Sequence, residues 1–148
     1  MGLCRRANDQ PSLAGSLAGL GQIDRDLKNT EAALQHYREA VEIYRRCTDP
    51  LRLAHTVRHL ADILRGDGAL DSARPLYEEA LNIYRNDPET PPLDLANATR
   101  GLALLRGTAG EVEEARLLWL EARALYDSVN VLAGVQESEA QICRLTAK

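Results

Sequence analysis

The sequence repeats one segment three times, as Ala33-Leu-Gln-His-Tyr-Arg-Glu-Ala40, Ala73-Arg-Pro-Leu-Tyr-Glu-Glu-Ala80 and Ala115-Arg-Leu-Leu-Trp-Leu-Glu-Ala122. The copies start 40 and then 42 residues apart. Each copy is followed by an aliphatic residue and a tyrosine, in Ile43-Tyr44, Ile83-Tyr84 and Leu125-Tyr126. Self-similarity at such a period is typical of repeat architectures, in which one supersecondary unit stacks on the next.

A second element recurs upstream of each segment. It consists of Leu-Ala, five further residues, and then Leu followed by Ala or Gly. The copies are Leu13-Ala14 with Leu20-Gly21, Leu53-Ala54 with Leu60-Ala61, and Leu95-Ala96 with Leu102-Ala103. A fainter fourth copy is Leu132-Ala133 with Glu139-Ala140, in which a charge replaces the second leucine. Each of the three repeat units therefore contains an upstream element and a downstream element, and each element has the same length in every unit.

The spacing of apolar residues in both elements is helical. In the first unit, apolar residues recur at intervals of three and four, at Leu13, Leu17, Leu20 and Ile23. In the second unit the same spacing is found at Leu53, Val57, Leu60 and Leu64. Asp49-Pro50 predicts a helix start, and Gly68 and Gly110 predict tight turns with positive φ. We expect seven helices and no strands, over residues 11–27, 30–47, 50–66, 70–86, 92–107, 111–127 and 131–146.

The pattern of the second unit resembles the tetratricopeptide repeat: an apolar-small pair (Leu60-Ala61), a turn glycine (Gly68), and then Ala73, Tyr77 and Ala80. The third unit matches at the equivalent positions. The first unit also matches, except that Lys28 stands where the turn glycine belongs. Units of 40–42 residues exceed the common 34 and resemble the longer class typified by kinesin light chains.

The resemblance implies an all-α fold, a right-handed superhelix (α-solenoid) of three antiparallel helix pairs in a single domain. The expected units cover residues 13–52, 53–94 and 95–130, and a capping helix covers residues 131–146. In that helix we expect Ala133, Ala140 and Ile142 to face the core. Leu120 is an extra apolar residue of the third unit, and it is covered either by the cap or by another subunit.

The composition excludes several function classes. The net charge is −4, and 16 Arg with two Lys in an acidic chain form no electrostatic footprint for nucleic acid. No apolar run is long enough to span a membrane, and no leader pattern is present, so the expected location is cytoplasmic. The aromatic residues comprise five Tyr and one Trp, and all of them fall at two repeated positions. We therefore expect every ring to pack in the fold and none to form a cage or cofactor site.

The first helix of each pair lines a concave groove in this family, which places nine residues on the groove. These ligand- or peptide-binding candidates are Gln22, Arg25, His55, Arg58, Asp62, Arg65, Asn97, Arg100 and Leu104. Two or three guanidiniums in one concavity favour an acidic segment or a C-terminal carboxylate, because arginine offers a planar bidentate fork. The alternative is that the arginines pair with Asp62 and solvent and only keep the surface soluble.

The sequence indicates no metal, cofactor or catalytic site. His55 and His59, with Asp62 three residues further on, have the spacing of metal ligands on one helix, but no Glu lies inside the histidine pair and no Cys is near it. Cys4, Cys47 and Cys143 match no zinc spacing, and we interpret them as reduced thiols. No serine lies in a nucleophile elbow and no phosphate-binding glycine loop is present. We expect no enzyme activity.

The sequence therefore predicts a non-catalytic scaffold that binds a peptide or protein segment in its groove, as a monomer or weak dimer. A different class of function is also open. In that alternative the chain is a structural or oligomerisation module, or the sensor part of a regulatory system, and its groove is filled by its own chain or another subunit.

Overall fold

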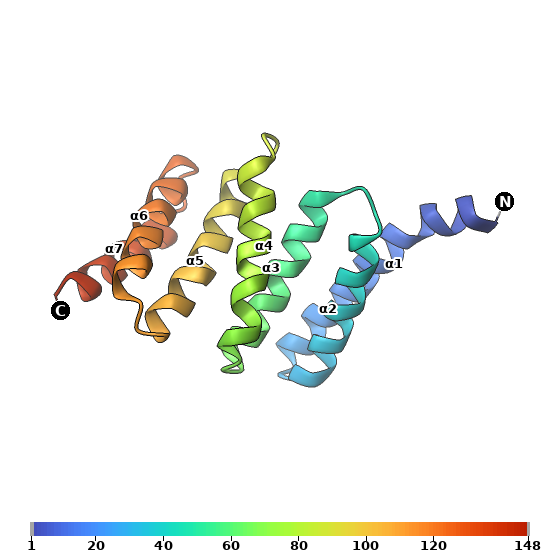
Figure 1. Cartoon of the computed structure of the whole chain (residues 1–148), viewed down its shortest axis with the longest axis horizontal. Helices are drawn as coiled ribbons and strands as arrows, with labels where there is room; N and C mark the ends of the chain where they lie inside the picture. The colour runs from blue at the N-terminus through green and yellow to red at the C-terminus, as the bar shows by residue number, and fades with distance from the viewer. Residues whose placement is uncertain (1, 148) are drawn as a thin grey trace. The chain divides into compact units, whose positions relative to one another are not determined.

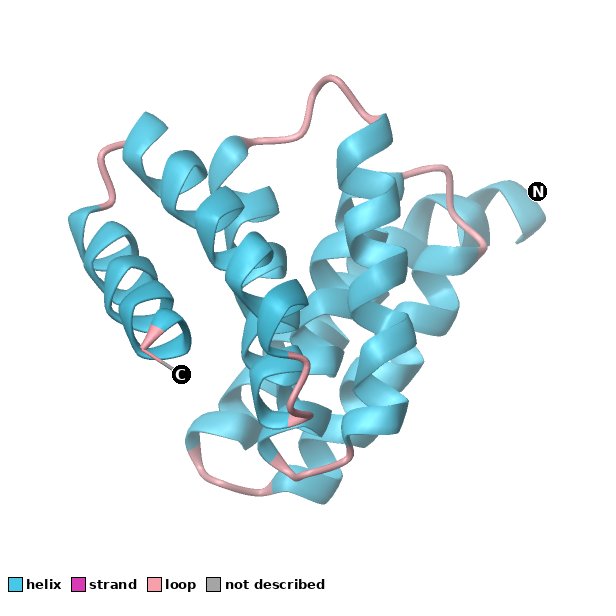
Figure 2. Cartoon of the chain, turned by 60° about the vertical axis from the view of Figure 1, so that its left-hand side comes forward, coloured by secondary structure: helices cyan, strands magenta, loops and turns pink. Residues whose placement is uncertain are grey.

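The structure is a computed structural model that describes residues 2–147, with side chains from residue 10 onward. These residues form helices joined by short turns, and they contain no strand (Figure 1, Figure 2). The helices are α1 (Gly2–Asp26), α2 (Thr30–Arg45), α3 (Pro50–Gly66), α4 (Leu70–Asn86), α5 (Pro92–Thr108), α6 (Val112–Ser128) and α7 (Leu132–Thr146). The predicted all-α class is confirmed, and the bounds of α2 to α7 lie within two residues of those predicted. Helix α1 is longer than predicted, because it begins at Gly2 and contains Pro11.

The chain forms two compact units, residues 1–76 and residues 77–148, and the boundary lies within α4. In the first unit, α2 contacts both α1 and α3. In the second, α6 contacts both α5 and α7. Each unit therefore consists of successive antiparallel helices, the packing expected of tetratricopeptide-like pairs. The repeat boundaries at residues 13–52, 53–94 and 95–130 are a different division of the chain, and they stay a prediction.

Four turns between successive helices have the same backbone geometry. The second residue after each helix adopts a left-handed conformation, with φ of 62° at Lys28, 85° at Gly68, 83° at Gly110 and 60° at Asn130. The next backbone N–H reaches back five residues to a helix carbonyl, at 2.8 Å in the first three turns and 2.9 Å in the fourth. This pairing satisfies carbonyls that a helix end otherwise leaves without a donor. The positive φ predicted for Gly68 and Gly110 is confirmed.

Replacing Lys28 by glycine is expected to stabilise the chain, because Lys28 occupies a conformation that costs an L-residue about 1–2 kcal/mol. The greater freedom of glycine in the unfolded chain offsets part of this gain, which leaves about 0.5–1 kcal/mol. Urea denaturation of Lys28→Gly measures the effect. Lys28→Ala keeps the side-chain strain and is the matched control, so equal stability of the two variants would contradict the explanation.

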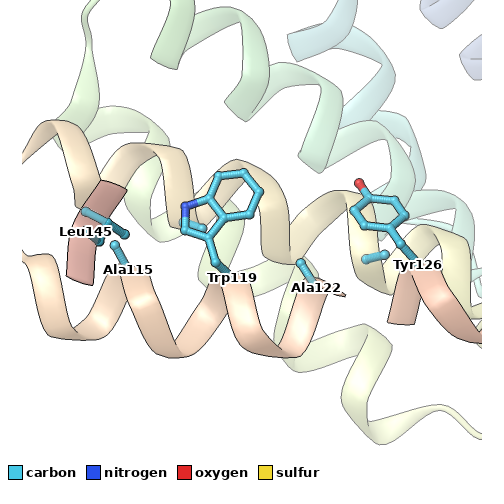
Figure 3. Packing of buried hydrophobic residues seen from close by; sticks show 7 residues of the cluster. Ala115, Trp119, Ala122, Tyr126 and Leu145 are labelled. Carbon is cyan, nitrogen blue, oxygen red and sulfur yellow. The ribbon is translucent and has the colours of Figure 1, made fainter. Parts of the chain in front are cut away.

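All six aromatic side chains are buried, as predicted. Tyr77 and Trp119 are the most deeply enclosed, at 0% and 1% exposure, and the others are Tyr37, Tyr44, Tyr84 and Tyr126. Trp119 and Tyr126 of α6 form a cluster with four alanines of α5 and α6 and with Leu145 of α7 (Figure 3). Small alanines let the helix backbones approach closely, and one large ring fills each remaining gap.

The face that α7 presents to the core differs from the predicted one. Ala133 and Ala140 are exposed, whereas Gly134, Ser138 and Leu145 are buried. A Cβ atom at Gly134 would lie 2.3 Å from Cγ of Tyr126, so only glycine lets α7 come this close to the ring. The prediction that Ala133 and Ala140 face the core was wrong. The close approach of α7 to Tyr126 requires glycine, and Gly134 lies one position after Ala133.

Helix α1 shows the same preference for small residues at contacts. Ala14 and Gly21 are buried, while Leu13, Leu20 and Ile23 are 46–55% exposed. A Cβ at Gly21 would lie 2.7 Å from the ring of Tyr37. The leucine pattern correctly predicted a helix, but the small residues mark the side that packs on α2.

Candidate functional site

The start of α3 follows from local sequence. The Asp49 carboxylate accepts a hydrogen bond from the backbone N–H of Arg52 at 3.2 Å, and Pro50 is the first helical residue. This is the predicted N-cap, which satisfies a donor that the first turn leaves without a partner. It sets the register of the charged residues further along α3.

A charged cluster lies along one face of α3. The Arg58 Nη1 donates to Asp62 Oδ2 at 2.7 Å, and the Arg65 guanidinium lies 3.8 Å from the other oxygen of Asp62. The Arg58 and Asp62 side chains are only 13% and 9% exposed. A buried carboxylate is tolerated only when it is paired. Asp62 therefore holds two guanidiniums on a single face of the helix.

His59 links this cluster to the packing around Tyr37. The two rings stack with centroids 5.7 Å apart, and Arg58 donates to His59 Nε2 at 3.4 Å. Burial, with a smaller contribution from the Arg58 charge, lowers the pKa of His59 to about 3, so His59 is neutral at physiological pH. Among the described residues, His59 Nδ1 and Arg58 Nε are buried without a hydrogen-bond partner.

The remaining candidates of the first unit lie next to this cluster. The Tyr37 hydroxyl donates to Gln22 at 3.3 Å, and Gln22 in turn donates to Asp26 at 3.0 Å. His55 Nε2 lies 3.2 Å from Nε2 of His59. Arg25 lines a hollow of about 180 Å³ together with Asp62 and four further residues of α2, α3 and the turn after α3. The structure thus brings together Gln22, Arg25, His55, Arg58, Asp62 and Arg65, although sequence reasoning had not included Tyr37 or His59 in the site.

In the second unit, α7 supplies the partner of Arg100. The Arg100 guanidinium forms two hydrogen bonds with the Glu137 carboxylate, at 2.5 Å and 3.0 Å. Sequence reasoning missed Glu137 as a site residue, but a signal was present. Glu137 follows Leu132 by five residues, just as Arg58 follows Leu53 and Arg100 follows Leu95. Equivalent positions of α5 and α7 therefore lie within contact distance.

The other two candidates of the second unit serve the packing of α5. Asn97 Oδ1 accepts a hydrogen bond from the Tyr126 hydroxyl at 2.7 Å. Leu104 is half-buried and packs against the Trp119 cluster. These contacts occupy the Asn97 carbonyl oxygen and one side of Leu104, so Arg100 is the more accessible recognition group of this unit.

Helix α7 covers Leu120 only in part. Leu120 is 39% exposed and lines a hollow of about 520 Å³ with Ile142 and Cys143 of α7. The Arg123–Glu139 ion pair, at 3.1 Å, also lines this hollow. Leu120, the extra leucine of the third sequence repeat, therefore still exposes apolar surface beside the capping helix α7.

Among the side chains that the structure describes, in residues 10–147, no set of three or more His, Cys, Asp or Glu residues is placed to hold a metal ion. Cys47 and Cys143 are free thiols, and the side chain of Cys4 lies outside the described part of the chain. None of the helices in the described residues combines the length and the apolar character needed to cross a bilayer.

Two solved structures have a fold similar to that of this chain. Aspartyl phosphate phosphatase F from Bacillus subtilis is 17% identical with a TM-score of 0.80, over 93% of this chain and 36% of that one. BtubC (BKLC) from P. vanneervenii is 16% identical with a TM-score of 0.70, over 93% of this chain and 65% of that one. The chain thus spans about a third of the length of the first protein and about two-thirds of the length of the second. No curated protein sequence matches it significantly.

Sequence profiles identify the family. A profile described as tetratricopeptide repeat matches residues 51–128, and a second profile with the same description matches residues 13–46. The matched ranges contain the three repeated segments and the left-handed residues Lys28, Gly68 and Gly110. The chain belongs to the tetratricopeptide repeat family, as the resemblance of its repeated segments had predicted.

Proposed function

We propose that the chain is a non-catalytic module that binds protein segments carrying a carboxylate, in the first unit through the side chains on α1 and α3 and in the second unit through those on α5 described above. Domains of this family typically act as protein-interaction modules. The observation that carries the carboxylate preference is the sharing of Asp62 by Arg58 and Arg65. Both guanidiniums therefore lie on one face of α3 beside a single shared carboxylate.

The arginines are held in place before any ligand binds. Asp62 fixes Arg58 through a short ion pair, and the Arg58 side chain is almost fully enclosed. A side chain that is already ordered loses less conformational entropy on binding, which favours affinity. Hydrogen bonds from a guanidinium to a carboxylate are also among the stronger ones in proteins.

In the second unit, the Glu137 carboxylate pairs with Arg100 and so limits the positive charge that a ligand can contact. With Glu137 in place, Arg100 already has a bidentate carboxylate partner. An incoming carboxylate must compete with Glu137 or approach the remaining N–H groups of Arg100. The two side chains are 38% and 33% exposed, so such exchange is sterically open.

The proposal predicts opposite effects for two substitutions at this ion pair. Arg100→Ala is expected to weaken binding of an acidic peptide about tenfold, the magnitude of one lost charge-assisted hydrogen-bonded contact. Glu137→Gln removes the competing charge and is expected to strengthen binding. Calorimetric titration with acetyl-Glu-Asp-Ala-Glu-Asp, carrying a free C-terminus, measures both changes.

Two controls keep this experiment specific. The same peptide with Gln and Asn in place of Glu and Asp, and with an amidated C-terminus, is expected not to bind. Arg58→Lys retains the charge beside Asp62 but loses the planar fork, so it tests the first unit with little risk to folding. If Arg100→Ala, Arg58→Lys and Glu137→Gln all left the affinity unchanged, the proposed surface would be wrong. The alternative structural role and the oligomeric state stay predictions.

A further inference from the structure

The side of the second unit formed by α4 and α6 carries a hollow of about 470 Å³. We call it the α4–α6 hollow; its apolar lining is Leu81, Leu102, Leu117 and Leu118, and its acidic lining is Glu78 and Glu114. Leu102 is buried at 4% exposure, whereas Leu117 is 55% exposed. Volumes of a few hundred Å³ are typical of ligand-binding clefts, and exposed leucine at such a site is a feature of interaction surfaces.

The charges around the α4–α6 hollow are not balanced. The two arginines that line it are already neutralised: Arg85 donates to Glu121 at 2.9 Å and Arg106 donates to Glu111 at 2.6 Å. Glu78 and Glu114 also line the hollow, and within the described residues neither has an ion-pair partner. The lining itself holds two carboxylates and two guanidiniums. With the partner carboxylates Glu111 and Glu121 counted, the hollow and the ion pairs at its edge carry two negative charges in excess.

The Arg85–Glu121 pair also shapes the hollow. It joins α4 to α6 with two hydrogen bonds, at 2.9 Å and 3.3 Å, from one Arg85 nitrogen. Arg106 is similarly held across the turn between α5 and α6. These pairs keep both guanidiniums in fixed positions, so neither is drawn toward Glu78 or Glu114. The negative charge thus stays available to a ligand.

We propose that the α4–α6 hollow docks a partner segment in which aliphatic side chains are flanked by lysine or arginine. The aliphatic side chains contact Leu117 and the leucines beneath it, and the basic groups pair with Glu78 and Glu114. This surface has the opposite charge preference to the face of α3, and it uses none of the same residues. The two proposals therefore fail or succeed independently.

The test uses one basic probe and one acidic probe on the full chain. The basic peptide is acetyl-Lys-Leu-Ile-Lys-Ala-Leu-Ile-Lys-amide, and the acidic peptide has glutamate in place of each lysine. In spectra of the ¹⁵N-labelled protein, the basic peptide is expected to shift the amide signals of α4 and α6 around Asn82 and Leu117. The acidic peptide is expected not to shift them.

Two variants test the apolar and the charged contributions separately. Leu117→Ser is expected to weaken binding of the basic peptide about tenfold, because most of the leucine contact is lost. Glu78→Gln with Glu114→Gln is expected to weaken it several-fold and to reduce its dependence on salt. The matched controls are Leu132→Ser, an exposed leucine of α7, and Glu113→Gln with Asp127→Asn, two exposed carboxylates of α6 outside the hollow.

Three results would overturn the proposal. The first is an unchanged affinity in both Leu117→Ser and the double glutamine variant. The second is that the basic peptide shifts signals of α3 instead, or that the acidic peptide binds equally well. The third is a fall in molar mass by light scattering in Leu117→Ser, which would show that a second copy of the chain occupies the hollow.

Discussion

Trp119→Ala is expected to lower the free energy of unfolding by about 3–5 kcal/mol, the usual cost of removing a large buried aromatic side chain. Trp119 is 1% exposed and lies among alanines of α5 and α6 and Leu145 of α7. Four of the six other buried residues of this cluster are alanines, whose short side chains cannot extend into the space that the ring leaves. Since domains are typically stable by about 5–15 kcal/mol, this loss is expected to unfold residues 77–148 at moderate temperature.

Urea denaturation followed by circular dichroism measures this effect without relying on the tryptophan signal. Leu117→Ala is the matched control on the same helix, because Leu117 is 55% exposed. We expect it to cost less than about 1 kcal/mol. If both variants lost similar stability, the enclosure of Trp119 would not explain its contribution.

Gly101→Ala is the second large effect, and it is expected to destabilise the chain although alanine favours helices. A Cβ at residue 101 would lie 2.3 Å from Cε1 and 2.6 Å from Cζ of Tyr77, whose side chain is fully buried. Overpacking of this kind costs about 1–3 kcal/mol. The gain in helix propensity, about 1 kcal/mol, offsets only part of that cost.

Gly107→Ala is the control for Gly101→Ala, because it adds the same methyl group to α5 where no atom lies within 4 Å. It is expected to leave stability unchanged or to raise it slightly. In a double-mutant cycle with Tyr77→Leu, the cost of Gly101→Ala is expected to shrink, since the smaller side chain makes room. Additive losses in the cycle would contradict the steric explanation.

Much of the fold was predictable because its signals are local and repeated three times. The alignment of Tyr37, Tyr77 and Trp119 predicted equivalent packing roles, and all three side chains are buried. The glycine at Gly68 predicted a left-handed turn, and Lys28 adopts that conformation too. A turn required by the repeat thus forces its geometry even on an unfavourable residue.

The contacts of the candidate site were predicted only where they lie within one helix. Arg58 and Asp62 are four residues apart on α3, and their pairing follows from helix geometry. The pairing of Arg100 with Glu137 joins residues 37 positions apart on different helices. It depends on how closely α5 and α7 approach, and no local pattern specifies that distance.

Repeated local patterns were enough to predict the helices, their turns, the buried aromatic positions and the family. The side of α1 and of α7 that packs on the neighbouring helix became evident only in the folded structure. On both helices that side carries a glycine, Gly21 or Gly134, whereas Leu20 and Ala133 are exposed. The reason is steric, because a ring such as Tyr37 or Tyr126 fits against a helix only where no Cβ projects.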